Sequence, residues 1–115
     1  MRAKIFSLEE ANSLIPILTG FLKRIKELRM KIESSKFVTK ELFDTKKELA
    51  STIQKTYSFG CIIKDLELGL VDFYFDYQGK IVLLCWRYGE NEIKFWHSTT
   101  SGYADRKPLE LLKTI

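Results

Sequence analysis

Residues 60–98 alternate apolar and polar side chains, the pattern of strands that bury one face. Glycine-bearing turns interrupt this alternation and divide it into predicted strands at 61–64, 70–76, 80–88 and 92–98. Because short connections join consecutive strands, we expect a three- to four-stranded antiparallel β-meander. The same stretch contains both cysteines, both tryptophans and the only histidine of the chain.

In the first half of the chain, apolar residues instead recur every three or four positions, as on the buried stripe of a helix. The stripe begins at Leu8, inside the capping-box sequence Ser7-Leu8-Glu9-Glu10, and it ends at Ile32. This spacing predicts one long helix. Pro16 lies inside it and has no amide hydrogen, so we expect a kink near Asn12-Ser13 that bends the helix around the sheet.

A second helix is predicted from Thr39, a capping residue, to about Ser58. Its predicted buried side carries Leu42, Leu49, Ile53 and Tyr57. Gly60 follows as a left-handed terminator. The polar link at 33–36 is short, so the two helices should pack antiparallel as a hairpin.

These patterns predict an α+β fold in a single domain, residues 1–115. A long N-terminal antiparallel helical hairpin (8–59) is expected to pack on the antiparallel sheet (61–98), and an irregular C-terminal tail (99–115) follows. A chain of 115 residues buries roughly two-thirds of its unfolded surface, so it needs neither a disulfide nor a metal to fold.

Two predicted turns decide which side chains share a face of the sheet. The segment Asp76-Tyr77-Gln78-Gly79 fits a type I turn, and Gln78-Gly79 alone fits a two-residue loop; the two differ by one residue in register. Gly89-Glu90 fits a type II′ turn, which pairs Leu84 with Phe95 and Val82, rather than Cys85, with His97.

This pairing would give one apolar face, suited to the helices, and one mixed face. The apolar face would carry Val82, Leu84, Trp86, Ile93 and Phe95. The mixed face would carry Leu83, Cys85, Arg87, Glu92, Lys94 and Trp96. Leu83 and Trp96 would be partly exposed unless the tail or a second chain covers them.

Composition excludes several classes of protein. With 45% hydrophobic and 30% charged residues, the chain is neither disordered nor a membrane protein. Glu9-Glu10 interrupts any secretory signal. Cys61 and Cys85 form no Cys-x-x-Cys motif, which favours reduced thiols in a cytoplasmic protein, although a single disulfide is also compatible with the sequence.

The charge is unevenly distributed. Residues 1–60 have 12 basic and 7 acidic side chains, whereas residues 61–115 have 7 basic and 8 acidic ones. A basic half can attract nucleic acid. Here the basic residues are mixed with glutamates at helical spacing and lack base-stacking aromatics, so we do not expect nucleic-acid binding.

Several short motifs are spread over nearly the whole chain: Phe6-Ser7-Leu8-Glu9-Glu10-Ala11-Asn12, Ile15-Pro16, Lys64-Asp65, Gly69-Leu70-Val71-Asp72-Phe73, Leu84-Cys85-Trp86-Arg87 with Gly89-Glu90, Phe95-Trp96-His97, Gly102 and Arg106. With them the chain resembles the prokaryotic family called domain of unknown function 2203. Asp105 stands where that pattern has glycine. The resemblance implies an uncharacterised cytosolic protein and supplies no activity.

Three chemistries are possible in principle and disfavoured by spacing. Cys61, Asp72, Cys85 and His97 are metal-ligand types, but none forms the close pair that structural zinc sites offer, so we expect no metal and no cofactor. The predicted pairing keeps Cys85 from His97, which argues against a cysteine nucleophile. Asp65, Asp72 and Asp76 are expected to cap amides or pair with cations rather than to act in hydrolysis.

The remaining possibility is binding. The candidate ligand- or partner-binding residues are Asp72, Arg87, Trp96, His97 and Arg106. They suit a small anionic ligand or an acidic protein segment. The alternative is an internal lattice in which Arg87 pairs with Glu92 and Arg106 ties down the tail.

The functional prediction is therefore a non-enzymatic interaction module that forms a homodimer or binds a protein partner, through the basic hairpin or the mixed sheet face. The alternative is a small anionic-ligand binding or hydrolytic domain. We expect no membrane partner.

Overall fold

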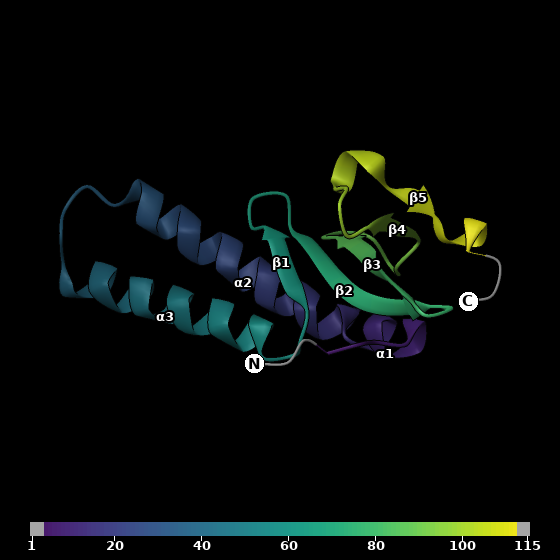
Figure 1. Cartoon of the computed structure of the whole chain (residues 1–115). Helices are drawn as coiled ribbons and strands as arrows, with labels where there is room; N and C mark the ends of the chain where they lie inside the picture. Colours follow the sequence, from purple (N-terminus) through teal and green to yellow (C-terminus); the bar gives the residue numbers. More distant parts are fainter. Residues whose placement is uncertain (1–3, 113–115) are drawn as a thin grey trace.

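The computed structural model describes residues 4–112, and the α+β class is confirmed (Figure 1). The ends of the predicted domain and tail, residues 1–3 and 113–115, lie outside the described residues. The helices are α1 (Leu8–Ser13), α2 (Ile15–Ser34) and α3 (Lys40–Tyr57). The strands are β1 (Ile62–Asp65), β2 (Leu70–Tyr77), β3 (Lys80–Arg87), β4 (Phe95–Ser98) and β5 (Lys107–Pro108).

The predicted long helix is two helices. The capping box forms as expected: the Ser7 amide donates to the Glu10 carboxylate, and the Glu10 amide donates to the Ser7 hydroxyl, both at 3.0 Å. The chain then breaks at Leu14, and Pro16 falls in the first turn of α2, where its missing amide hydrogen would have had no helical partner. The expected kink is therefore an interruption at Leu14, whose backbone stays in the right-handed helical region, and the prediction of one continuous helix was wrong.

The helices α2 and α3 form the expected antiparallel hairpin, and Thr39 caps α3 (Figure 1). The buried side of α3 differs from the prediction, because Leu42, Leu49 and Ile53 are only partly buried and Tyr57 is exposed. The buried positions are Thr45, Thr52 and Thr56. Each threonine hydroxyl donates to the carbonyl four residues earlier, so its polar group is satisfied while its methyl group packs.

The five strands form one antiparallel sheet in chain order. The turn after β2 is the two-residue alternative: Tyr77 pairs with Lys80, and Gln78 and Gly79 both have positive φ angles. The tail was expected to be irregular. It instead supplies β5 and the short 3₁₀ turns Tyr103–Asp105 and Leu109–Leu111.

The predicted register between β3 and β4 was wrong by one residue. Leu84 pairs with Trp96, not Phe95, and Leu83 pairs with His97. The connection is longer than the predicted two-residue turn, because the Glu90 carboxylate accepts from the Arg87 amide at 2.7 Å and redirects the chain. Asn12 in α1 then holds the Ile93 amide, also at 2.7 Å. Consequently Trp96 faces the helices, whereas Phe95 and His97 face the opposite side.

The core lies between the helices and one face of the sheet. It is built around Phe6, Ala11, Ile15, Leu18, Leu22 and Ile25 from the helical side and Val71, Phe73, Leu84, Trp86 and Ile93 from the sheet side. The tail lies on the other side of the sheet (Figure 1).

Only the near part of the hairpin packs on the sheet, which corrects the expectation that the whole hairpin does so. The far part projects beyond it and gives the molecule dimensions of 53 × 27 × 25 Å (Figure 1). None of the described helices combines the length and apolar character needed to cross a membrane.

Candidate functional site

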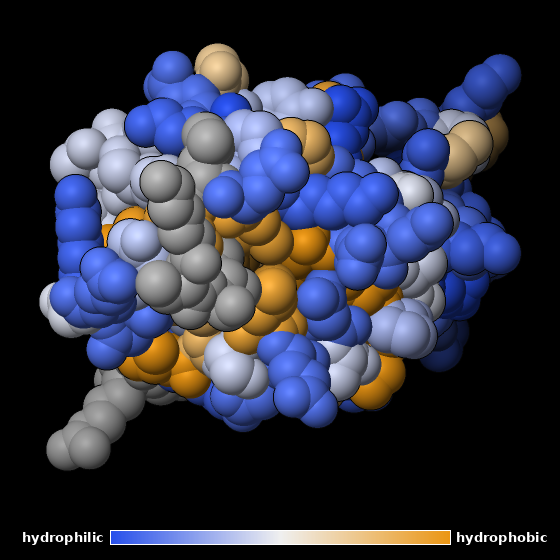
Figure 2. All heavy atoms as spheres, turned by 90° about the vertical axis from the view of Figure 1, so that its right-hand side faces the viewer, coloured by the Kyte–Doolittle hydropathy of each residue, from blue (hydrophilic) through white to orange (hydrophobic). Residues whose placement is uncertain are grey.

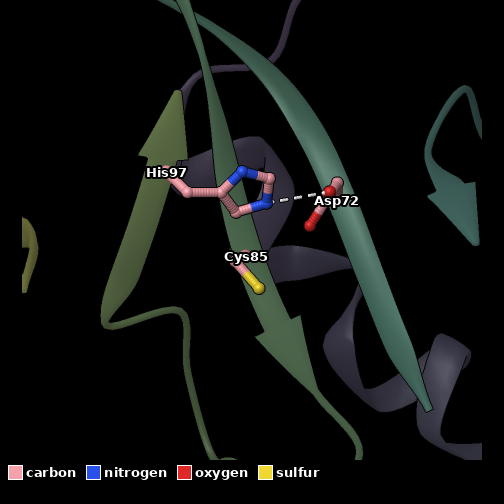
Figure 3. Close-up of side chains that lie close together, drawn as sticks. All are labelled: Asp72, Cys85 and His97. Carbon is pink, nitrogen blue, oxygen red and sulfur yellow. Dashed lines mark hydrogen bonds and ion pairs between the residues drawn. The ribbon is translucent and has the colours of Figure 1, made fainter. Parts of the chain in front are cut away.

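Three chemically reactive side chains meet on the tail side of the sheet. Asp72, Cys85 and His97 come from β2, β3 and β4, the three central strands. Cys85 lies directly beside Asp72, and the His97 ring reaches across β3 toward Asp72 (Figure 3). A carboxylate oxygen, the thiol sulfur and a ring nitrogen all lie within 4.8 Å of one another.

The prediction that Cys85 and His97 do not meet was wrong. A one-residue change of register moves every side chain of a strand to the other face, and here it brings His97 to the face of Cys85. One signal in the sequence did point to this site. Asp72 stands between Val71 and Phe73 in the apolar first half of β2, and a buried carboxylate requires a polar partner.

Hydrogen bonds fix the orientation of the His97 ring. Its Nδ1 lies 2.8 Å from the Ser98 carbonyl oxygen, which can only accept, so Nδ1 carries a proton. Its Nε2 lies 3.0 Å from Oδ2 of Asp72, and the two groups share a second proton. Neither ring nitrogen is directed at Cys85 as its base, so the three residues do not form a nucleophile–base arrangement.

Burial dominates the electrostatics of the site. Asp72 and Cys85 are each 1% exposed, and His97 is 2% exposed. Burial raises the pKa of the Asp72 carboxyl, although the His97 charge opposes this shift. Burial, followed by the negative charge of Asp72, raises the pKa of the Cys85 thiol to about 12. The thiol is therefore protonated at neutral pH and is a poor nucleophile.

One polar atom of the site lacks a well-formed hydrogen bond: within the described residues, buried Oδ1 of Asp72 has no such bond, and the Cys85 thiol is the weak donor beside this carboxylate. Buried carboxylate oxygens are normally satisfied, so this atom is an exception that calls for a ligand or a function.

A cavity of about 140 Å³ leads to the three side chains. Its other walls are formed by Lys64 and Leu70 from the sheet and by Ser101, Gly102 and Tyr103 from the tail. A larger hollow of about 470 Å³ lies elsewhere, between the start of α1 and the last strands. Its lining includes Leu8, Ile93, Phe95, Pro108 and Leu109, and apolar side chains gather near the centre of that face (Figure 2). Among the described residues that line it, no three His, Cys, Asp or Glu side chains gather as Asp72, Cys85 and His97 do.

The five predicted binding residues do not line one pocket. Asp72 and His97 lie in the cavity, whereas Trp96 packs against the core on the helix side. Arg106 bonds both oxygens of Glu90, at 2.7 and 2.9 Å, and its guanidinium stacks 4.0 Å from the centre of the Phe95 ring. The tail is thus tied to the sheet, as the lattice alternative expected.

Arg87 also contacts the tail, but not through the predicted pair with Glu92. Its Nη1 donates to the Tyr103 hydroxyl at 2.9 Å. Lys64 and Tyr103 line the cavity and were not among the predicted site residues. Cys61 and Cys85 are both free thiols, so the disulfide alternative is not realised.

A protein-family model described as "Uncharacterized conserved protein (DUF2203)" matches residues 4–109. This match confirms the resemblance drawn from the motifs. No curated protein and no solved structure matches the chain.

Proposed function

Because the chain belongs to the DUF2203 family, whose description assigns no activity, we propose a function from its own residues: it binds a transition-metal ion, Zn²⁺ in the first instance, through Asp72, Cys85 and His97. Carboxylate oxygen, thiolate sulfur and imidazole nitrogen are the three ligand types that zinc takes in proteins.

The observation that carries this proposal is the arrangement of the three ligand atoms within 4.8 Å, with Oδ1 of Asp72 unpartnered beside them. The His97 ring supports it. Histidines that bind metal through one nitrogen almost always donate the other N–H to a carbonyl or carboxylate. His97 donates Nδ1–H to the Ser98 carbonyl and directs Nε2 toward Asp72.

Charge balance also supports a divalent ion. A buried carboxylate is unfavourable without a compensating charge. Here the Asp72 carboxylate is paired with a single imidazole, that of His97. A divalent ion would bind the carboxylate and displace the thiol proton, and the two negative ligands would then balance its charge.

Three protein ligands leave a fourth tetrahedral position for water or another ligand, as in catalytic rather than structural zinc sites. That position would face the cavity. The proposal therefore belongs to the ligand-binding or hydrolytic alternative. Free thiols at positions 61 and 85 suit the reducing cytoplasm that we also propose as its location.

Titration of the metal-free protein with Co²⁺, and competition by Zn²⁺, tests this proposal. We expect one ion per chain, a thiolate-to-cobalt charge-transfer band, and a loss of affinity of more than about 100-fold in Cys85→Ala and His97→Ala. Cys61→Ala is the matched control, since Cys61 is equally buried and donates to the Thr56 carbonyl, away from the site.

Absence of cobalt binding would contradict the metal proposal, and two further outcomes would contradict coordination by Cys85. One is stoichiometric cobalt without the charge-transfer band, and the other is equal affinity in the wild type and in Cys85→Ala. Circular dichroism of each variant separates loss of the site from loss of the fold.

Self-association is a second proposed function, favoured by the far end of the hairpin. Phe37 is 78% exposed, Val38 is 95% exposed, and Met30 and Phe43 are each 61% exposed. Large apolar side chains gathered at one exposed end are typical of an interaction surface. A second copy of the chain would bury these side chains in a symmetric contact.

A further inference from the structure

We infer that the open coordination position of the Asp72–Cys85–His97 site takes a small oxyanion, a carboxylate or phosphate of about four or five non-hydrogen atoms, with Lys64 as its counter-charge. This inference rests on the proposed metal function. It names the class of ligand that the bound ion would hold.

The cavity sets the size of the ligand. The three metal-binding side chains form its floor, so a molecule within it would lie against the ion's open position. Its volume of about 140 Å³ corresponds to only a few water molecules, each of which occupies about 30 Å³ in the liquid. Acetate, carbonate and inorganic phosphate fit that space, and a nucleotide does not.

The charges favour an anion. With carboxylate and thiolate bound, a divalent ion would be neutralised, so a charged side chain that lines the cavity would favour a fourth ligand of the opposite charge. Lys64 lines the same cavity and lies at the bulge where β1 departs from its pairing with β2.

Lys64 differs in one respect from the two predicted anion-binding arginines. Arg87 is bonded to Tyr103 and Arg106 to Glu90. Within residues 4–112, Lys64 forms no ion pair and no side-chain hydrogen bond. It is therefore the cation at this cavity whose donors are available to a ligand, and an ammonium group is a frequent binder of phosphate and carboxylate.

The experiment uses the cobalt-loaded full chain and follows its visible absorption bands during titration with sodium acetate and with inorganic phosphate, at constant ionic strength set by sodium perchlorate. We expect saturable band shifts with at least one of the two anions. In Lys64→Met the anion affinity should fall about 10-fold or more, while the affinity for Co²⁺ stays within about 3-fold of wild type. Lys80→Met, at the exposed start of β3, is the matched control and should change neither.

The outcomes separate this inference from the function on which it rests. Failure to bind cobalt overturns the metal proposal, and the inference with it. Cobalt binding with bands that respond to neither anion overturns the inference alone. A wild-type response in Lys64→Met overturns the role of Lys64 and therefore the reason for expecting an anion.

Discussion

Asp72 is the residue on which the site depends, and it is also a local weakness of the fold. It is 1% exposed in a strand whose neighbouring positions are apolar, and only one of its two carboxylate oxygens is bonded. Removing an ionised group from water is costly, and burial raises the pKa of this carboxyl. Buried carboxyls with a raised pKa are enriched at functional sites.

Asp72→Asn should abolish metal binding and stabilise the metal-free protein at pH 7 by about 1 kcal/mol. The amide can still donate to Nε2 of His97, and the buried charge is gone. The folded pKa of Asp72 lies above its ordinary value of 3.8. Protonation of Asp72 therefore stabilises the folded protein below pH 3.8, and this contribution is lost as the pH rises through the folded pKa.

The advantage of Asp72→Asn over wild type should therefore grow between pH 4 and pH 7. Urea unfolding of both proteins with a chelator present measures this difference. An advantage that shrinks as the pH rises would show that the carboxylate is stabilising in the folded protein.

At the scale of elements, the turn between β1 and β2 positions the strand that carries Asp72. The Asp65 carboxylate accepts from the Leu68 amide at 2.9 Å, and the Gly69 carbonyl accepts from the Tyr88 amide at 2.8 Å. Gly69 has a φ of +72°, and a Cβ added there would lie 2.5 Å from Cβ of Tyr88. Both the backbone conformation and the close approach require glycine.

Gly69→Ala should lower the free energy of unfolding by about 1–3 kcal/mol. Gly20→Ala is its matched control, because Gly20 is an exposed residue of α2 with nothing within 4 Å of an added Cβ. This substitution should instead raise the free energy of unfolding by roughly 0.5–1 kcal/mol. Urea unfolding at neutral pH measures both changes. Equal effects of the two substitutions would refute the steric account of Gly69.

Local signals predicted the elements well and the pairing of β4 badly. The caps at Ser7 and Thr39, the strands β2 and β3, and the left-handed Gly60 all depend on interactions between near neighbours. The register of β4 depends on a bond between Asn12 and Ile93, residues 81 positions apart. No local sequence pattern indicates such a contact. His97 was therefore assigned to the wrong face of the sheet, and its position beside Cys85 was missed.

At the scale of the whole molecule, the two proposed functions fall on separate surfaces, one on the sheet and one on the hairpin. Asp72, Cys85 and His97 line a cavity that residues 101–103 of the tail also wall. Exposed Met30, Phe37, Val38 and Phe43 belong to the hairpin end, which projects away from the sheet (Figure 1). The tail was predicted to be irregular because its short segments have no periodicity of their own. Its order comes from pairing with β4 and from the Arg106–Glu90 bond.

If the hairpin end mediates self-association, the wild-type chain should be a dimer by light scattering at micromolar concentration. The double substitution Phe37→Ser with Val38→Ser should then give a monomer that is still folded by circular dichroism, because both side chains are exposed. Ile17→Ser is the control, since Ile17 is 47% exposed at the other end of α2. A monomeric wild type, or a dimer that survives the double substitution, would rule this surface out.

The tail turn that covers the cavity would also limit how fast a ligand enters and leaves it. Ser101, Gly102 and Tyr103 form its outer wall, and this segment is fastened by the contacts of Arg87 with Tyr103 and of Arg106 with Glu90. An ion or an anion must pass these residues to reach side chains that are 1–2% exposed. If the site binds an ion, we therefore expect exchange of that ion to require movement of the tail, so an ion acquired before the tail docks on β4 would be released slowly from the folded chain.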